Sequence, residues 1–292
     1  MESLSTPKRL LIILVVLLIA GGVCIAGGAG GVKVGTLSVF ALCGILAFVI
    51  NWLVFIPSSL IKSEQYFDLT GSITYLSVIA AAVYLVPDLG MRAKIVAIMV
   101  SLWTLRLGIF LFTRILRAGH DDRFDKIKVD PLRFFMVWTL QGLWVLLTAA
   151  CALSIISGGV DKTIGLIGYI GITMWLIGFT IEIIADRQKT AFKKDPGNKG
   201  KFISSGLWSW SRHPNYFGEI LLWCGVAVLA LPILIGWQYV TLISPVFVYL
   251  LLAKVSGIPQ LAAKGKERWG NDPAYQKYLA RTSLLIPMPP KS

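Results

Sequence analysis

The feature that most constrains this chain is a succession of long apolar segments. About eight of them can be read, each near the roughly 20 residues that an α-helix needs to cross the hydrocarbon core of a bilayer. They lie at approximately 10–27, 36–57, 72–87, 93–115, 132–157, 163–185, 217–235 and 238–256. Because backbone polar groups have no water to bind inside a bilayer, each segment is predicted to form an α-helix.

The composition excludes the soluble alternatives. The 292 residues are 56% hydrophobic and only 15% charged, with a mean hydropathy of +0.74. Soluble domains carry roughly 25% charged residues, and so apolar a chain cannot cover its surface with polar side chains. A soluble enzyme, a disordered chain and a disulfide scaffold are therefore excluded. The sequence predicts one all-α, integral membrane domain over residues 1–292.

The basic residues predict the orientation of the spans. Lys and Arg number 28 against 15 Asp and Glu, a net charge of +13. They gather at the N-terminus, in the gaps after the second, fourth and sixth segments, and in the tail, whereas the alternate gaps hold only Lys33, Arg92, Lys94 and Lys162. Basic loops stay on the cytoplasmic side, so both termini are predicted to be cytoplasmic. No base-reading module accompanies the charge, and nucleic-acid binding is not expected.

Histidine and cysteine are too sparse for a metal centre. The histidines are His120 and His213, and the four cysteines lie far apart within apolar segments. A zinc or di-iron site needs three or more such ligands brought together. No metal cofactor is predicted.

Ionisable residues within or beside spans mark candidate functional positions, because they are costly in a bilayer. Asp68 begins the third segment, where it could also act as a helix N-cap. Glu182 and Asp186 lie one helical turn apart in the sixth segment and share a face. The fourth segment and its end carry Arg106, Arg114 and Arg117. With both termini cytoplasmic, all of these fall at the cytoplasmic face, which indicates a site for a charged, water-borne ligand.

The densest polar stretch is SSGLWSWSRHPNYFGEILLW at 204–223. An aromatic belt at the membrane interface would explain its tryptophans. A belt does not explain the run from Arg212 to Glu219, in which arginine and histidine can bind phosphate while asparagine and tyrosine can orient an amide or a ribose. We therefore predict a ligand site here. Residues 257–292, which include the polar segment KGKERWGNDPAYQKYLARTSLLIP, are expected to close over it.

SRHPNYFGE, preceded by IEIIADRQK and followed by RWGNDPAYQKYLARTSLLIP, resembles the steroid 5α-reductase family. The similarity is strongest to a branch of multi-span proteins that carry the C-terminal 3-oxo-5α-steroid 4-dehydrogenase domain. The wider superfamily includes sterol Δ14-reductases and isoprenylcysteine carboxyl methyltransferases, which share the RHP-x-Y-x-G core. The core motif alone therefore does not choose between reduction and methyl transfer.

The resemblance implies a helical bundle that grips NADPH at its cytoplasmic side and admits a lipid-soluble enone from the bilayer. An acidic side chain polarises the carbonyl while hydride reaches the β-carbon. Asp68 occupies the position of a glutamate in the family, whose side chain is one methylene longer. Tyr66, two residues before Asp68 in the sequence, is the second catalytic candidate. In the family's motif Tyr216 replaces the usual phenylalanine. The resemblance assigns cofactor binding to Arg106, Arg114, Arg117, Glu182, Asp186, Arg187, Lys189, Arg212, His213, Asn215, Tyr216, Glu219, Arg268, Asp272, Tyr278 and Arg281.

The predicted function is thus an NADPH-dependent reductase of a conjugated double bond in a lipid, in a bacterial inner membrane or the endoplasmic reticulum. The alternative is a methyltransferase that uses S-adenosylmethionine. Those relatives carry paired glutamates after the last helix, whereas here Glu267 stands alone before Arg268, and the many arginines favour a phosphate-rich cofactor. A transporter or scaffold is the third reading, although no inverted repeat is detected.

Overall fold

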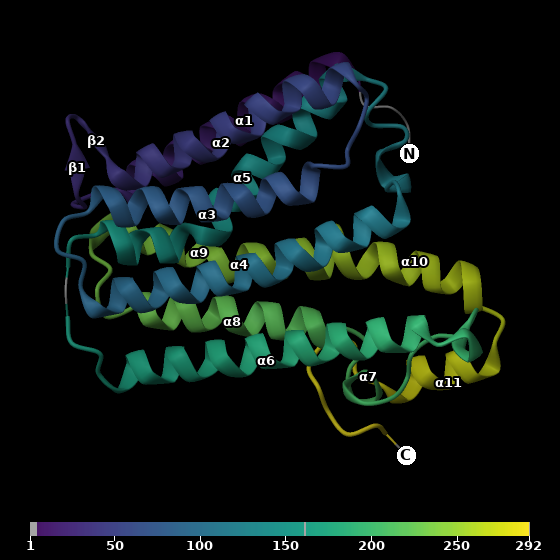
Figure 1. Ribbon diagram of the computed structural model, residues 1–292. Helices are drawn as coiled ribbons and strands as arrows, with labels where there is room; N and C mark the ends of the chain where they lie inside the picture. Colours follow the sequence, from purple (N-terminus) through teal and green to yellow (C-terminus); the bar gives the residue numbers. More distant parts are fainter. Residues whose placement is uncertain (1–4, 161, 292) are drawn as a thin grey trace. The chain divides into compact units, whose positions relative to one another are not determined.

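The computed structural model describes residues 5–160 and 162–291, apart from the side chains of Arg117, Ala118 and Asp122. This part of the chain is mostly helical, with one short β pair (Figure 1). Seven of its helices are long and apolar enough to cross a membrane. The seventh predicted segment is the exception, because its helix, Pro214–Ala230, is shorter. The predicted all-α, multi-span fold is confirmed.

Two compact units make up the chain. The first comprises Met1–Gly165 and Ala230–Ser244, and the second comprises Leu166–Leu229 and Pro245–Ser292. The single domain over 1–292 stays a prediction.

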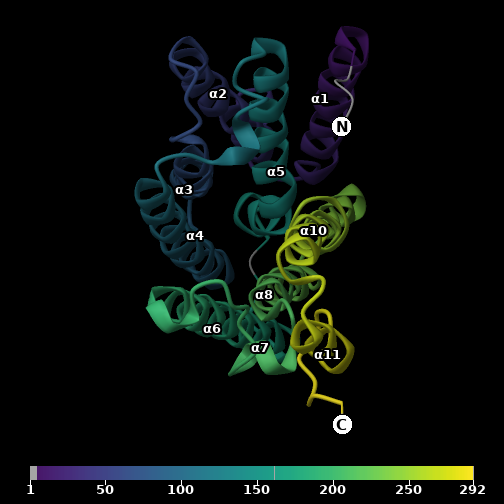
Figure 2. The same ribbon diagram turned by 90° about the vertical axis from the view of Figure 1, so that its right-hand side faces the viewer.

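The first unit holds five long helices and a small hairpin. Its elements are α1 (Thr6–Gly27), β1 (Lys33–Val34), β2 (Leu37–Ser38), α2 (Val39–Leu60), α3 (Phe67–Leu85), α4 (Met91–Ala118), η1 (Asp122–Phe124), α5 (Pro131–Ser157) and the 3₁₀ helix η3 (Gly236–Leu242). The helix α5 is the core of this unit, since it contacts α1, α2, α3 and α4 and most of its residues are buried (Figure 2). It begins at Pro131, and its N-cap Asp130 accepts a hydrogen bond from the Arg133 N–H at 3.0 Å.

Aromatic packing fixes one end of the first unit. Phe124, Phe134 and Trp138 form a buried cluster, and the ring of Phe67 lies 5.0 Å from that of Phe124 and 5.1 Å from that of Trp138. Offset and edge-on aromatic pairs of this kind are favourable beyond the area they bury. The cluster therefore ties the start of α3, where Asp68 lies, to the α4–α5 connection.

Ionic contacts join the basic connections at that same end. The Glu64 carboxylate, between α2 and α3, accepts hydrogen bonds from the Asp121 N–H at 2.9 Å and from Lys128 Nζ at 2.8 Å. Arg9, near the start of α1, pairs with Asp130. At the other end of α5 the Val32 N–H binds the Ser157 carbonyl. The basic connections thus share one end of the first unit, as the alternation of charge predicted.

The second unit is built on α6 (Leu166–Lys194) and α8 (Pro214–Ala230), which run side by side (Figure 1). Its other elements are η2 (Pro196–Asn198), α7 (Leu207–Trp210), the continuation of α9 (Ile243–Leu250), the π-helical turn η4 (Leu251–Val255), α10 (Gly257–Trp269) and α11 (Pro273–Arg281). The sequence turns polar after Ser256, but the helical path does not end there. It continues as α10, so that the helix containing the last apolar segment runs from Gly236 to Trp269.

Glycines let α6 and α8 approach closely. A Cβ atom on Gly178 would lie 2.5 Å from the Gly218 carbonyl oxygen, and one on Gly171 would lie 2.7 Å from that of Gly225. Helices in bilayers often pack through small residues. Lipid is as apolar as the side chains, so close van der Waals contact between backbones, and not the hydrophobic effect, favours their association. This contact sets the position of the first turn of α8 against Glu182 on α6, since the Glu182 N lies 2.8 Å from a Cβ on Gly218.

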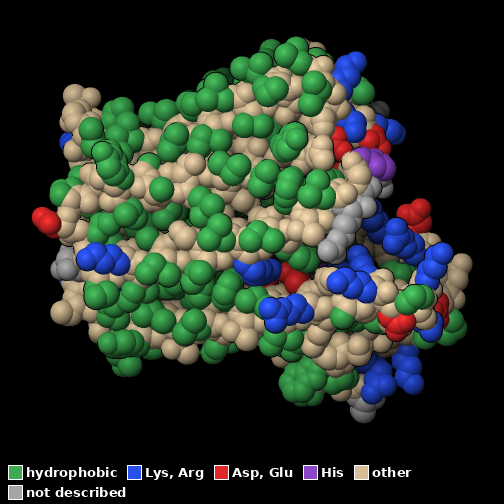
Figure 3. Space-filling model, in the orientation of Figure 1, with side chains coloured by type: hydrophobic (Ala, Val, Ile, Leu, Met, Phe, Trp, Pro, Cys, Tyr) green, Lys and Arg blue, Asp and Glu red, His purple; other side chains and the backbone are tan. Residues whose placement is uncertain are grey.

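The outward faces of the long helices are apolar. Leu10, Leu14 and Leu18 are exposed on α1, and Leu176 and Ile177 are exposed on α6. Hydrophobic side chains cover the helical sides in Figure 3, whereas Lys and Arg side chains gather where α6 and α10 end. Such a surface is stable only in lipid. The protein is an integral, multi-pass membrane protein.

Candidate functional site

The polar stretch before α8 is held by the C-terminal tail. The Arg212 N–H donates to the Ser283 carbonyl at 2.8 Å, and Ser211 Oγ donates to the Leu285 carbonyl at 2.7 Å. Further along the tail, the Met288 N–H binds the Trp210 carbonyl at 3.1 Å. Segments more than 70 residues apart in sequence are therefore fixed together at the start of α8.

His213 and Tyr216 form a stacked pair at this helix start, with ring centroids 5.5 Å apart and an interplanar angle of 9°. His213 is only 9% exposed, and its backbone N–H binds Ser211 Oγ at 3.1 Å. Burial, reinforced by the charges of Lys189 and Arg212, lowers the pKa of His213 to about 4. The imidazole is therefore neutral at physiological pH.

Two buried atoms of this stretch lack a protein partner. Among the residues that the structure describes, neither Arg212 Nε nor His213 Nδ1 makes a hydrogen bond. Buried polar groups are nearly always satisfied, because an unmade hydrogen bond costs free energy. The two atoms indicate a place where a polar ligand can bind.

The helix α6 brings its acids to the same region. Glu182 is 2% exposed, Asp186 is also buried, and the residues lie one turn apart. Glu182 packs against Gly218 on α8, which directly precedes Glu219. Asn215 and Glu219 are partly buried in the first two turns of α8. These acidic and amide groups lie on elements that pack against each other.

Lys189 and Trp208 fix the short helix α7 to α6. Lys189 Nζ lies 4.6 Å from the centroid of the Trp208 ring, and Trp208 Nε1 donates to the Ala185 carbonyl at 3.1 Å. The Leu207 N–H binds Gln188 Oε1 at 3.0 Å. Arg187, between these residues, is exposed. Lys189 therefore makes a cation–π contact in addition to its predicted part in ligand binding.

The tail residues predicted to bind cofactor fall into two groups: those that make contacts within the protein, and Arg268, which lines a cavity. The Tyr278 hydroxyl donates to the Trp208 carbonyl at 2.8 Å, and burial raises its pKa despite the opposing charge of Arg212. Asp272 caps α11 by accepting from the Ala274 N–H at 2.8 Å. Arg281 Nε donates to the Lys291 carbonyl at 2.6 Å. These contacts hold the tail together, while Arg268 lines a cavity.

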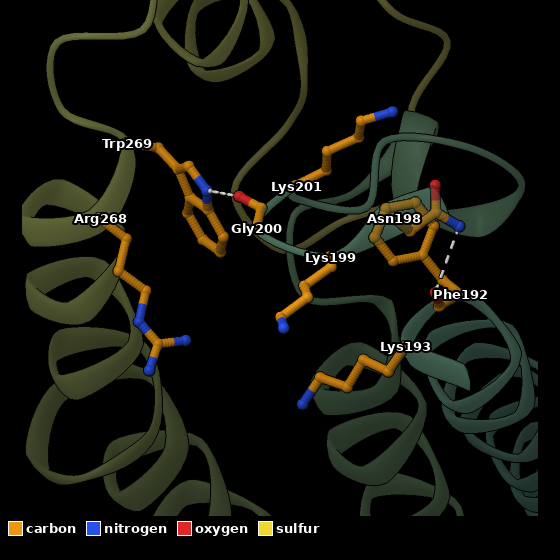
Figure 4. A pocket seen from close by; sticks show the side chains of 8 residues that line it. All are labelled: Phe192, Lys193, Asn198, Lys199, Gly200, Lys201, Arg268 and Trp269. Atoms are coloured by element: carbon orange, nitrogen blue, oxygen red, sulfur yellow. Dashed lines mark hydrogen bonds between the residues drawn. The ribbon is translucent and has the colours of Figure 1, made fainter. Parts of the chain in front are cut away.

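That cavity, of about 480 Å³, lies between the end of α6, the following loop and the end of α10 (Figure 4). It is lined by Phe192, Lys193, Asn198, Lys199, Gly200, Lys201, Arg268 and Trp269. Of these residues only Arg268 was a sequence-predicted site residue. The lysines after the sixth apolar segment were interpreted as topology signals, and the run KKDPGNKGK was the feature that could have pointed to a site.

The first unit holds the predicted catalytic residues. Arg114 Nη2 donates to Asp68 Oδ2 at 3.2 Å, which links α4 to α3. Tyr66 is largely exposed at the start of α3, and Arg106 is partly buried on α4. The side chain of Arg117 lies outside the described residues. The expectation that Asp68 caps α3 is wrong, because Tyr66 occupies the N-cap and Asp68 lies in the first turn.

Sequence reasoning missed Glu64 in the first unit. Glu64 is 5% exposed. Its burial alone would raise its pKa, but the hydrogen bonds from Lys128 and from the Asp121 N–H outweigh burial and lower that pKa. Glu64 is therefore ionised and organises the loops that flank Asp68. In the sequence it is one acid in a polar gap, and no pattern distinguishes it.

A comparison with protein families matches residues 54–282 to a family described as "Protein of unknown function (DUF1295)". The chain belongs to this family. The DUF1295 match covers most of the chain, including both stretches that hold candidate residues, from Asp68 to Arg114 and from Glu182 to Arg281.

Curated relatives of this DUF1295 protein include reductase and methyltransferase names. A "3-oxo-5-alpha-steroid 4-dehydrogenase 1" of Bos taurus is 39% identical over 70 residues, 24% of this chain and 26% of the relative. "Probable O-methyltransferase ustE" of Ustilaginoidea virens is 33% identical over 90 residues, 31% of each chain. An uncharacterized protein of Schizosaccharomyces pombe is 27% identical over 159 residues, 45% of this chain and 46% of the relative.

The matches thus span less than half the length of these curated relatives. They confirm the resemblance to the steroid 5α-reductase family that the sequence motifs indicated. No solved structure matches the chain.

Proposed function

We propose that this protein is a membrane reductase that uses NADPH to saturate a conjugated double bond in a lipid-soluble substrate. The observation that carries the proposal is the buried start of α8, where Arg212 Nε and His213 Nδ1 lack partners among the described residues. This stretch also holds the motif that resembles the steroid 5α-reductases. The similarity to mammalian 3-oxo-5-alpha-steroid 4-dehydrogenases supports the same reaction class.

The residues of the second unit suit a phosphorylated nicotinamide dinucleotide. Such a ligand presents anionic phosphates, ribose hydroxyls and a carboxamide. Arg212 supplies a guanidinium, and the N-terminus of α8 supplies backbone N–H groups and the positive end of the helix dipole. Glu182 and Asp186 can accept hydrogen bonds from an amide or from hydroxyls. When bound, the cofactor supplies the hydride, and the protein supplies position and electrostatics.

His213 and Tyr216 would orient the ligand. The neutral imidazole can donate or accept a hydrogen bond, and its stacking on Tyr216 holds the ring in one orientation. The tail bonds at Ser283 and Leu285 fix the backbone beneath it. Binding residues that are already held in position reduce the entropy lost when a reactant is oriented.

In the first unit we assign the substrate carbonyl to Tyr66 and to the ion pair of Asp68 with Arg114. Asp68 is paired with Arg114, so the donors available to a carbonyl oxygen are the guanidinium N–H groups of the pair and the phenol of Tyr66. Preorganised donors that meet developing negative charge are each worth about 3 kcal/mol in the transition state. The substrate would enter from the bilayer, and the positive-inside rule supports a cytoplasmic position for the basic ends of the helices, from which the cofactor would bind.

The second candidate function is methyl transfer from S-adenosylmethionine. The match to "Probable O-methyltransferase ustE" favours it specifically. The two cofactors differ in charge, since S-adenosylmethionine carries a cationic sulfonium and no phosphate. The basic surroundings of Arg212 and Lys189 therefore favour the dinucleotide.

A thermal-shift titration distinguishes the two cofactors. The purified full chain in an uncharged detergent is titrated with NADPH, NADH and S-adenosylmethionine, because a ligand that binds the folded state raises its melting temperature. We expect NADPH to give the largest, saturable shift. A shift with S-adenosylmethionine alone would contradict the reductase proposal and favour the methyltransferase.

The variant Asn215→Ala tests the position of the site. Loss of one hydrogen bond of about 1.4 kcal/mol should weaken NADPH binding about tenfold without unfolding the protein. The matched control is Asn271→Ala, which removes the same side chain from an exposed position of the same unit. Equal affinity of Asn215→Ala and wild type for NADPH would show that the cofactor lies elsewhere.

A further inference from the structure

The cavity at the end of α6 is lined on several sides by cations. Lys193 ends α6, Lys199 and Lys201 lie in the loop, and Arg268 lies in the last turn of α10. In Figure 4 the charged ends of Lys193, Lys199 and Arg268 extend into one shared space, while Lys201 points away from it. No acidic residue is among the residues that line the cavity.

Neighbouring carboxylates do not neutralise the charges of Lys199, Lys201 and Arg268. Within the described part of the chain, no carboxylate lies within 4 Å of the charged atoms of Lys199, Lys201 or Arg268 in an ion pair. The nearby Asp195 is engaged in its own turn, where it accepts from the Gly197 N–H at 2.9 Å and from Asn198 Nδ2 at 3.2 Å. Like charges that share a cavity repel each other, and a bound anion relieves that repulsion.

The helix dipole explains only part of this arrangement. Cations are favoured in the last turn of a helix, which accounts for Lys193 on α6 and for Arg268 on α10. The dipole does not account for Lys199, which lies beyond η2 in the loop. The conformation of the loop instead holds Lys199 at the cavity. Gly200 takes a φ of +81°, which favours glycine, and Trp269 Nε1 donates to the Gly200 carbonyl at 2.5 Å.

The walls of the cavity are aromatic and fixed. Trp269 contacts Phe202, with ring centroids 5.9 Å apart, and Phe202 contacts Tyr275 and Tyr278 at 5.0 and 5.4 Å. Asn198 Nδ2 binds the Phe192 carbonyl at 3.2 Å, so the opposite wall is also tied. A volume of about 480 Å³ is within the usual range of small-molecule sites.

We propose that this cavity is a binding site for the phosphate group of an organic phosphate, held by Lys193, Lys199 and Arg268 beside Trp269. Lysine and arginine bind phosphate through charge-assisted hydrogen bonds, and an aromatic wall suits the organic part of the ligand. The phosphate can come from a soluble nucleotide or from a lipid headgroup, because the cavity lies at the ends of two helices long enough to span a membrane. The site does not depend on the reductase proposal.

The test uses the full chain in uncharged detergent and three probes: inorganic pyrophosphate, adenosine 2′,5′-bisphosphate and short-chain phosphatidic acid, with short-chain phosphatidylcholine as the neutral lipid. Affinity is measured by titration and melting temperature. We expect saturable binding of at least one phosphate probe. A response to the two soluble probes indicates a nucleotide, whereas a response to phosphatidic acid alone indicates a lipid headgroup.

The decisive variant is Lys199→Gln with Arg268→Gln, which should weaken binding at least about tenfold through the loss of two charge-assisted hydrogen bonds. Its control is Lys264→Gln with Lys277→Gln, which removes the same charge from exposed positions of the same unit that do not line the cavity. The charge-preserving pair Lys199→Arg with Arg268→Lys should retain binding, which separates lost charge from misfolding.

Equal weakening in the two glutamine double variants would overturn the proposal, because it would show attraction to the overall positive charge only. Absence of saturable binding of every phosphate probe by wild type would overturn it as well. Failure of NADPH to bind while pyrophosphate still binds would contradict the reductase proposal and leave the phosphate site standing.

Discussion

A buried histidine makes the stability of this protein depend on pH. The folded-state pKa of His213 is about 4, below the ordinary value of about 6.5. Between these two values the unfolded chain binds more protons than the folded one, so the free energy of unfolding decreases as the pH falls through this window and levels off below pH 4. The decrease amounts to about 3 kcal/mol from this group.

We predict that His213→Gln removes this part of the pH dependence. Glutamine does not titrate, so the difference in melting temperature between pH 7 and pH 4.5 should be smaller in the variant than in wild type. Fluorescence melting in detergent measures it, since the chain has 10 tryptophans. The chain's other histidine provides the control, because His120→Gln makes the same replacement at an exposed position. Parallel slopes for wild type and His213→Gln would contradict the prediction.

At the residue scale, the sequence indicated which side chains could bind a ligand, but it did not show which side chains contact one another. It selected Arg212, His213 and Tyr216 from one motif, and the structure holds this stretch in place through the tail. It interpreted Lys199 only as a topology signal, because nothing in the sequence shows that the loop after α6 meets the end of α10. The catalytic roles of Asp68 and Tyr66 stay predictions.

At the element scale, the contact between α6 and α8 sets the geometry of the candidate site. Gly178 and Gly218 face each other, and a Cβ on either would lie 2.5 Å from the carbonyl oxygen of the other. A backbone atom cannot move aside as a flexible side chain can. The helices would have to separate, and Glu182 and the first turn of α8 would separate with them.

The variant Gly178→Ala tests this contact. Overpacking of this kind costs about 1–3 kcal/mol, so we expect a lower melting temperature and weaker NADPH binding together. Gly22→Ala is the control, because a Cβ there meets no atom within 4 Å and alanine stabilises a helix interior relative to glycine by about 1 kcal/mol. If Gly178→Ala melts at or above the wild-type temperature, the helices are not in backbone contact.

Element boundaries were predictable where apolar runs end at a clear signal. The fifth segment was expected at 132–157, and α5 runs from Pro131 to Ser157, with an aspartate cap before a proline. The end of the last segment was not predictable in this way. The chain turns polar after Ser256, yet η4 and α10 continue the helical path to Trp269, because polarity marks the membrane boundary and does not by itself end a helix.

At the scale of the whole molecule, the apolar segments predicted a multi-span helical protein because the bilayer leaves the backbone few alternatives. They could not predict which helix forms the core of the first unit. The helix α5 is no more apolar than α2, yet it is far more buried. The burial of α5 follows from its contacts with four other helices. The hydropathy pattern of the sequence does not contain these contacts.

The orientation of the first unit in the membrane can be predicted, because its two ends differ in charge. Arg9, at the start of α1, pairs with Asp130 in the α4–α5 connection, whereas the turn between β1 and β2 follows the other end of α1. The positive-inside rule places the first of these ends in the cytoplasm. Single cysteines at Lys126→Cys and Thr36→Cys, both exposed positions, are introduced after the four native cysteines are replaced. In intact bacterial cells an impermeant maleimide should label Thr36→Cys and should label Lys126→Cys only after lysis. The reverse pattern would place the basic end of the first unit outside and contradict the prediction.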